Sequence, residues 1–176
     1  MTVLSKVLKG KNIILGVTGS IACYKAIDLA SKLTQQGALV DVIMTESATE
    51  FVKPLAFQSI THRNVVSSLF DPKGDIGINH VALAERADLV IIAPATAATI
   101  AKIANGISDN ALGTTLLATQ APIIVAPAMD GNMFENAATQ QNIATLIERN
   151  IFIAGPAIGR LASGLTGIGR LLDTSK

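Results

Sequence analysis

Short apolar runs alternate with amphipathic segments along this chain of 176 residues, and this alternation limits its fold more than any other feature. The runs carry Val, Ile and Leu at nearly every position, which is typical of strands buried on both faces of a parallel sheet. Strands that alternate with helices build a sheet covered by helices on both sides. We therefore predict an α/β, doubly wound, mainly parallel sheet in a single domain. The predicted strands are 12–17, 39–44, 89–93, 123–126 and 151–154, and the predicted helices are 21–35, 47–60, 96–105, 110–119 and 137–149.

The low charge of the chain predicts contact with other subunits. Charged residues make up 15% of the sequence, against about 25% in a typical domain, so we expect part of the surface to be buried in a homo-oligomer. The formal net charge is +1 and aromatic residues make up only 3%. Nucleic acid is therefore disfavoured as a partner, because the chain offers neither a basic field nor a stacking surface.

Cys23 is the single cysteine, so it forms neither an internal disulfide nor a multi-cysteine zinc site. The N-terminus lacks the charged, apolar and small-residue order of a signal peptide. Pro94, Lys102 and Asp109 interrupt the apolar region that begins at Leu89, so no membrane-spanning helix is expected. These features favour a cytoplasmic protein that does not contact a membrane.

Two segments lack a regular repeat of apolar residues. Residues 70–79 contain Asp-Pro and two glycines, which predicts a loop. Residues 155–170 contain five glycines and no periodic pattern. A connection of that length without structure of its own is either disordered or a functional flap.

Small and hydroxyl-bearing residues follow three predicted strands. Residues 16–22 read Gly-Val-Thr-Gly-Ser-Ile-Ala, Thr45 and Ser47 follow the second strand, and residues 96–99 follow the third. Open α/β sheets bind ligands at this carboxyl edge, and glycine lets backbone N–H groups approach a phosphate. The glycine spacing differs from the dinucleotide fingerprint. A phosphate or mononucleotide site and plain turns with helix caps both remain open here.

Residues 127–134 read Pro-Ala-Met-Asp-Gly-Asn-Met-Phe and follow the fourth predicted strand. Methionine and phenylalanine are unusual in a loop. Either their side chains pack back onto the core, or the loop closes over a ligand that Asp130 contacts.

The chain has two histidines, and neither lies at metal-ligand spacing from the cysteine. His62 lies in a polar stretch and is expected at the surface. His80 precedes an apolar run, where a structural role is more common than a catalytic one. A base needs a partner that the sequence does not identify.

Several ordered motifs, taken together, resemble the homo-oligomeric flavin-containing cysteine decarboxylases, and within them the flavoprotein domain of the branch that acts on phosphopantothenoylcysteine. The resemblance runs from about Lys11 to Leu172. The motifs that carry it are 16–22 with Tyr24 and Lys25, 87–90 leading into 93–96, Asn79 with His80, 126–129, and 159–164 through 167–170.

This resemblance implies a Rossmann-like flavoprotein over residues 1–176, with 155–170 as a flexible substrate flap. The implied activity is FMN-dependent decarboxylation of 4'-phosphopantothenoylcysteine to 4'-phosphopantetheine in coenzyme A biosynthesis. It also implies a homotrimer or dodecamer and a CTP-dependent synthetase domain or partner. No metal is expected, because the histidines and the cysteine lack metal-ligand spacing. The implied catalytic residues are His80 and Ser163; the substrate residues are Ala128, Met129 and Asp130; the FMN residues are Gly19, Ser20, Ile21, Thr45, Ser47, Thr96, Ala97, Ala98 and Thr99.

Four positions depart from the family pattern. Asp130 replaces an asparagine, Phe134 a tryptophan and Ala98 an asparagine, while Ser163 replaces the flap cysteine that donates a proton in the final reduction. An ionised carboxylate only accepts hydrogen bonds, whereas an amide also donates them. Serine is a far poorer acid than a thiol near neutral pH.

These departures leave three alternatives open. The first is an oxidative peptidyl-cysteine decarboxylase that releases an enethiol. The second is a catalytically inactive, flavin-binding regulatory subunit. The third is a nicotinamide-dependent Rossmann enzyme, which the glycine spacing disfavours.

Overall fold

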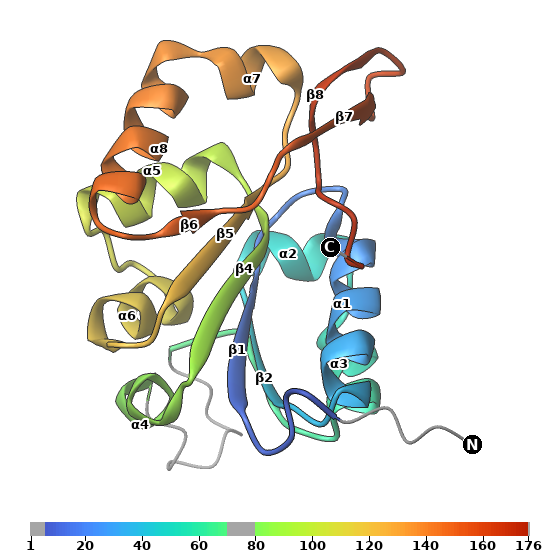
Figure 1. Ribbon diagram of the computed structural model, residues 1–176, viewed down its shortest axis with the longest axis vertical. Helices are drawn as coiled ribbons and strands as arrows, with labels where there is room; N and C mark the ends of the chain where they lie inside the picture. The colour runs from blue at the N-terminus through green and yellow to red at the C-terminus, as the bar shows by residue number, and fades with distance from the viewer. Residues whose placement is uncertain (1–5, 70–79, 176) are drawn as a thin grey trace.

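The computed structural model describes residues 6–69 and 80–175. Its centre is a six-stranded parallel sheet in the order β3-β2-β1-β4-β5-β6 (Figure 1). The order reverses between β1 and β4, which is where doubly wound sheets open a crevice. The strands are β1 (Asn12–Val17), β2 (Leu39–Met44), β3 (Val65–Val66), β4 (Leu89–Ala95), β5 (Ile123–Pro127) and β6 (Phe152–Ile153).

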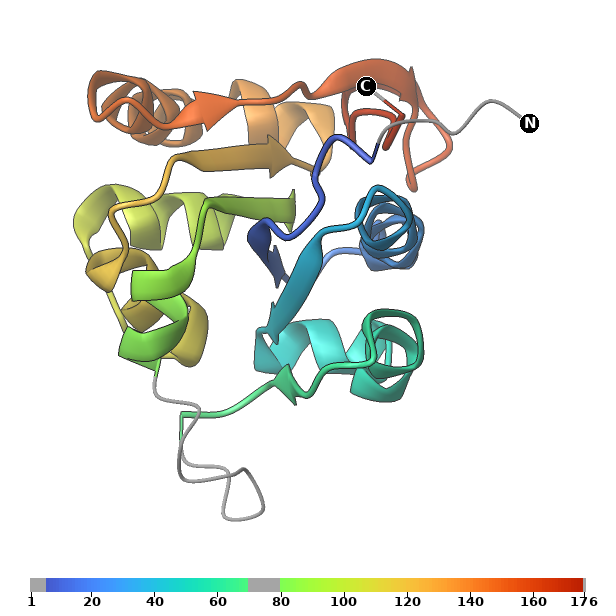
Figure 2. The same ribbon diagram turned by 60° about the horizontal axis from the view of Figure 1, so that its bottom comes forward.

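Helices cover both faces of this sheet (Figure 2). Helices α1 and α3 lie on one side, and α4, α5, α6 and α8 lie on the other. The α/β, doubly wound fold is therefore confirmed. The helices are α1 (Cys23–Gln35), α2 (Glu46–Phe51), α3 (Pro54–Thr61), α4 (His80–Arg86), α5 (Ala97–Asn105), α6 (Ala111–Ala118), α7 (Gly131–Glu135) and α8 (Ala137–Glu148).

Side chains of alternate strand residues pack in two separate cores, because successive side chains of a strand point to opposite faces of the sheet. Ile13 and Leu15 of β1 pack in the core on the α1 side, together with Phe57 of α3. Ile14 packs on the opposite side with Ile100 of α5. The near-continuous apolar strands of the sequence follow from this burial on two faces.

Prolines account for two differences from the predicted boundaries. The predicted helix 47–60 is two helices, because Pro54 starts α3 at a position where its missing N–H costs nothing. Strand β4 continues through Pro94 to Ala95 instead of ending before it. The register between β4 and β5 shifts between Ile92 and Ala95, so the ladder does not need a hydrogen bond from Pro94.

Residues 155–170, predicted as disordered or a flap, contain an antiparallel hairpin of β7 (Ala157–Arg160) and β8 (Thr166–Arg170). Disorder was therefore the wrong alternative. The pairing is short and crowded with glycine, so it leaves no alternating apolar pattern in the sequence. The hairpin stands beyond the carboxyl end of β5 (Figure 1).

A buried charge links strand β2 to the helix that leads into β4. Asp41 accepts hydrogen bonds from Arg63 Nε at 2.7 Å and from Arg86 of α4 at 2.8 Å. Its carboxylate is therefore paired on both oxygens, as a buried charge requires. The predicted loop 70–79 lies outside the described residues. Within residues 6–69 and 80–175, no helix has both the length and the apolarity needed to cross a membrane.

Candidate functional site

A cavity of about 420 Å³ opens where β1, β2 and β4 end. We name it the strand-end cavity. A cavity of this size suits a small organic ligand. The predicted cofactor residues that line it are Gly19, Thr45, Ser47, Thr96, Ala97, Ala98 and Thr99, and the further lining residues include Lys102, Asp109, Asn110 and Met133.

The strand ends are tied together beneath this cavity by Thr18. Its buried hydroxyl donates to the carbonyl oxygen of Pro94 at 2.7 Å and accepts from the backbone N–H of Thr96 at 3.0 Å. Gly19 then passes very close to Ser47, because a Cβ on Gly19 would lie 2.4 Å from the Ser47 Cβ. Only glycine permits this approach, so the turn after β1 and the turn after β2 form one wall.

Two of the predicted hydroxyl residues also cap helices. Thr45 Oγ1 accepts from the N–H of Ala48 at 3.3 Å, and Thr96 Oγ1 accepts from the N–H of Thr99 at 3.2 Å. The capping interpretation is thus correct for both residues, but it does not exclude ligand contact, because both side chains still line the cavity.

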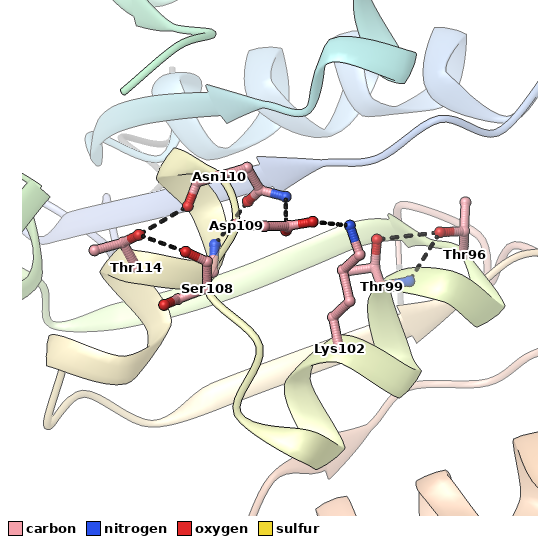
Figure 3. A network of polar contacts seen from close by, with 8 residues as sticks. Thr96, Thr99, Lys102, Ser108, Asp109, Asn110 and Thr114 are labelled. Atoms are coloured by element: carbon pink, nitrogen blue, oxygen red, sulfur yellow. Dashed lines mark hydrogen bonds and ion pairs between the residues drawn. The ribbon is translucent and has the colours of Figure 1, made fainter. Parts of the chain in front are cut away.

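A polar network forms the far side of the strand-end cavity (Figure 3). Lys102 of α5 pairs with Asp109 at 2.6 Å, and Asn110 donates to the other Asp109 oxygen at 3.1 Å. The hydrogen bond from Lys102 holds the pKa of the Asp109 carboxyl below its ordinary value. Asn110 caps α6 by accepting from the N–H of Gly113 at 2.9 Å. This network was not predicted from the sequence as part of the site, because its only signal there is two charges close to an apolar helix.

A second cavity, of about 560 Å³, lies between the start of α1 and the β7–β8 hairpin. We name it the hairpin cavity. It contains the three predicted substrate residues and Ser163, which lies in the turn of the hairpin. Its lining residues are Ser20, Ile21, Ala22, Tyr24, Lys25, Ala128, Met129, Asp130, Arg160, Leu161, Ala162, Ser163, Gly169, Arg170 and Leu171.

The predicted substrate loop is fastened to the base of the hairpin. The N–H of Met129 donates to the carbonyl oxygen of Gly169 at 3.0 Å. Asp130 then starts the short helix α7, where one carboxylate oxygen accepts from the N–H of Asn132 at 3.0 Å. The packing interpretation is confirmed for Met129 and Phe134, which pack against the core. Met129 and Asp130 also line a cavity, so contact with a ligand stays a prediction.

The structure divides the predicted cofactor residues between the two cavities. Ser20 and Ile21 line the hairpin cavity, while Gly19 before them lines the strand-end cavity. Ser20 does not cap α1 as its N-cap residue; its hydroxyl accepts from the N–H of Ala22 at 3.2 Å within the turn. Two consecutive residues, Gly19 and Ser20, therefore line different cavities.

His80 lines neither cavity within one chain. It is the half-buried first residue of α4, a helix that packs against α6. Cys23 is fully buried, its thiol donates to the carbonyl oxygen of Thr18 at 3.0 Å, and burial raises its pKa. It is a packing residue, as predicted.

A family model described as "Flavoprotein" matches residues 2–176.

The chain belongs to the flavoprotein family.

This flavoprotein is 48% identical over 166 residues to the "Coenzyme A biosynthesis bifunctional protein CoaBC" of Vibrio vulnificus strain YJ016. That alignment covers 94% of this flavoprotein but only 41% of the relative. The chain thus spans less than half of the length of that curated relative.

Two solved structures share the fold of this flavoprotein. A cysteine-to-serine mutant of PPC decarboxylase complexed with pantothenoylaminoethenethiol aligns with a TM-score of 0.82 at 31% identity, over 95% of this chain and 93% of the other. The FMN-dependent cysteine decarboxylase SpaF aligns with a TM-score of 0.80 at 31% identity, over 93% of this chain and 91% of the other. The resemblance inferred from the motifs is confirmed.

Proposed function

We propose that this flavoprotein binds FMN in the strand-end cavity and catalyses the decarboxylation of 4'-phosphopantothenoylcysteine to 4'-phosphopantetheine. The observation that carries the proposal is that consecutive residues, Gly19 and Ser20, line two cavities, one with the chemistry of a phosphate cradle and one with the substrate loop. The relatives named for coenzyme A biosynthesis and PPC decarboxylase support the assignment.

The residues of the strand-end cavity fit FMN. Thr96 and Thr99 present hydroxyls that lie 3.1 Å apart, and they stand at the N-terminus of α5, where backbone N–H groups favour an anion. Ser47 is exposed and Gly19 has no side chain, so a phosphate can approach both turns. Lys102 also lines the cavity, where Asp109 balances its charge. The family's asparagine contact is absent because Ala98 stands there.

FMN, when bound, supplies the reversible two-electron chemistry that removing and returning a hydride requires. The chain's own residues bind and orient the substrate. We propose that Met129 and Asp130 hold its cysteinyl end and that the hairpin excludes water from it. Asp130 already accepts one backbone hydrogen bond, so its remaining acceptor capacity suits an N–H donor of the substrate rather than its carboxylate.

Ser163 favours a second candidate product, the enethiol that remains after oxidation and decarboxylation. It is exposed in the hairpin turn and lines the hairpin cavity. A thiol has a pKa near 8.5, whereas a serine hydroxyl holds its proton far more tightly. The chain's one thiol, Cys23, is buried and bonded to Thr18, so it cannot replace the missing acid. The PPC decarboxylase structure in which a serine replaces a cysteine is complexed with pantothenoylaminoethenethiol, which supports this candidate.

His80 would act in this chemistry from a second copy of the chain. It lines neither cavity of its own chain, and the low content of charged residues favours burial between subunits. We propose a homo-oligomer on this ground, and the family resemblance favours a homotrimer or a dodecamer. We also propose that the chain works with a CTP-dependent synthetase domain or partner, because the relative named above is bifunctional.

The test is to load the purified protein with FMN, add 4'-phosphopantothenoylcysteine, and measure CO₂ together with the mass of the product. The proposal expects CO₂ and either 4'-phosphopantetheine or an enethiol lighter by two hydrogens. FMN binding without CO₂ release would favour an inactive flavin-binding subunit. Release of CO₂ only from a peptide with a C-terminal cysteine would favour a peptidyl-cysteine decarboxylase.

A further inference from the structure

His80 is the first residue of helix α4, so the contacts that hold α4 also determine where the imidazole lies. The helix has seven residues and ends at Arg86, which places Arg86 roughly 9 Å from His80 along the helix axis. The segment that leads into His80 lies outside the described residues. In the described part of the chain, α4 is held at its middle and at its end.

The middle of α4 packs against the other helices of its layer. Leu83 and Ala84 are buried in the core on the α5 side. The carbonyl oxygen of Ala84 also accepts from the hydroxyl of Thr119, which directly follows α6, at 3.0 Å. Apolar packing keeps α4 close to the sheet, but it is non-directional, so it restrains a tilt of the helix only weakly.

The end of α4 is fixed to the sheet by a directional contact. A terminal nitrogen of Arg86 donates to Asp41 Oδ2 of strand β2 at 2.8 Å. The Asp41 side chain is only 10% exposed, and salt screens a buried pair much less than a surface pair. Asp41 and Arg86 line neither the strand-end cavity nor the hairpin cavity. Any effect of this ion pair on the site therefore passes through α4.

Arg63 pairs with the same carboxylate but belongs to a different part of the fold. It donates to Asp41 Oδ1 at 2.7 Å and to Oδ2 at 3.3 Å, and it lies between α3 and β3. Loss of Arg86 thus leaves both oxygens of Asp41 paired, whereas loss of Arg63 removes the printed partner of Oδ1. A buried carboxylate oxygen without a partner is costly, so Arg63 should matter more for stability than Arg86.

We propose that Asp41 and Arg86 are positioning residues for His80: their ion pair holds α4 against β2 and thereby fixes the place of the imidazole. This inference rests on the proposed function, in which His80 acts from a second copy of the chain. A displacement of about 1 Å in a reacting group can lower turnover about a hundredfold. A tilt of α4 at its Arg86 end would move His80 at the opposite end.

The experiment measures kcat, KM and the free energy of unfolding of the FMN-loaded parent, Arg86→Gln and Arg63→Gln, with 4'-phosphopantothenoylcysteine as substrate. We expect Arg86→Gln to lower kcat about tenfold or more with KM and FMN affinity unchanged. Arg63→Gln, the matched control, should lower the free energy of unfolding more than Arg86→Gln does, yet keep the kcat of the parent. A merely structural role would rank the two variants in the same order for kcat and for stability.

Arg86→Lys is the conservative variant, because it keeps the charge and can supply the single donor that Asp41 Oδ2 receives from Arg86. It should recover most of the kcat that Arg86→Gln loses. Equal kcat in the parent and in Arg86→Gln would overturn the inference. So would a fall in kcat in Arg63→Gln as large as in Arg86→Gln, since each variant removes one charge beside Asp41 but only one of them releases α4.

A second measurement does not depend on turnover. The chain has two histidines, His62 and His80, so NMR of the protein with ¹³C-labelled histidine gives two imidazole signals, which His62→Asn assigns. We expect Arg86→Gln to shift or broaden the His80 signal more than Arg63→Gln does. A His80 signal that is unmoved in Arg86→Gln would overturn the inference.

Failure of the proposed function gives a different result from failure of this inference. If the parent releases no CO₂ but the His80 signal moves in Arg86→Gln, the ion pair positions His80 and the proposed function fails. If the parent releases CO₂ while Arg86→Gln keeps both its kcat and its His80 signal, the proposed function stands and the positioning role fails.

Discussion

The N–H of Met129 donates to the carbonyl oxygen of Gly169 at 3.0 Å, and this bond joins the substrate loop to the hairpin. Gly169 has φ +125°, and a Cβ there would lie 2.1 Å from the Met129 carbonyl oxygen. The approach is possible only without a side chain. The loop and the hairpin base therefore form one continuous wall of the hairpin cavity, while the turn that carries Ser163 is exposed.

Gly169→Ala should break this contact. We expect it to lower the free energy of unfolding by about 2–4 kcal/mol, because it combines backbone strain with a clash against backbone atoms. Denaturant unfolding measures the change. Gly164→Ala is the control, since Gly164 also has a positive φ, +86°, but has nothing within 4 Å of its Cβ position. An equal loss of stability in both variants would show that backbone strain, and not the clash, is the cause.

Thr18→Val should loosen the join between the ends of β1 and β4. The substitution leaves the Thr96 N–H without its acceptor, and the Pro94 carbonyl keeps only the longer bond from the Thr18 N–H at 3.3 Å. We expect a loss of about 1–3 kcal/mol in stability and weaker FMN binding. Thr115→Val removes a buried hydroxyl that bonds only within α6, to Ala111. It should leave FMN affinity, measured by flavin fluorescence, unchanged.

Ser163→Cys should shift the product toward the fully reduced 4'-phosphopantetheine, because it places an acid of pKa near 8.5 in the hairpin turn. Mass spectrometry of the product measures the shift. Ser59→Cys, on the exposed end of α3, adds a thiol outside both cavities and should change nothing. Fully reduced product from all three proteins would show that another group already donates the proton, and enethiol from all three would show that a thiol in the turn is not sufficient.

The Lys102–Asp109 pair should make stability depend on pH in acid. The Asp109 pKa is lowered in the folded chain from its ordinary 3.8 by the hydrogen bond from Lys102. The stability that the pair contributes is therefore complete above pH 3.8 and is lost as the pH falls through the lower folded value. Unfolding measurements should show Asp109→Asn less stable than the parent at pH 6, with the gap closing as the pH falls below 3.8. A constant gap at every pH would contradict this.

His80→Asn and Gly19→Ala should restore activity to each other when mixed. Gly19→Ala places a Cβ 2.4 Å from the Ser47 Cβ and should abolish FMN binding, while His80→Asn should bind FMN but lose turnover. If His80 serves the cavity of another subunit, a mixed oligomer contains one complete site. Subunit exchange followed by the CO₂ assay measures the recovery. No recovery, despite exchange seen by native mass spectrometry, would place His80 in its own subunit's site.

The amino-acid pattern alone was sufficient for most of the sheet. Five of the six strands were predicted within two residues of their observed ends, because a strand buried on two faces is apolar at nearly every position. Strand β3 was not predicted, because a strand of two residues is too short to show an alternation of apolar and polar residues. Helix α4 was missed because a helix of seven residues offers too few turns for an apolar face to stand out.

The sequence predicts which residues form the site, because they follow the ends of predicted strands. It does not predict that these residues are divided between two cavities. Gly19 and Ser20 are neighbours in the chain and line different cavities. Lys25 and Arg170 are 145 positions apart and line the same one. Local residue preferences indicate which segments become strands and turns, and parallel strands bring their carboxyl ends to one edge. Which side chains then share a cavity depends on contacts between distant segments, such as the Met129–Gly169 bond, and these exist only once the sheet has formed.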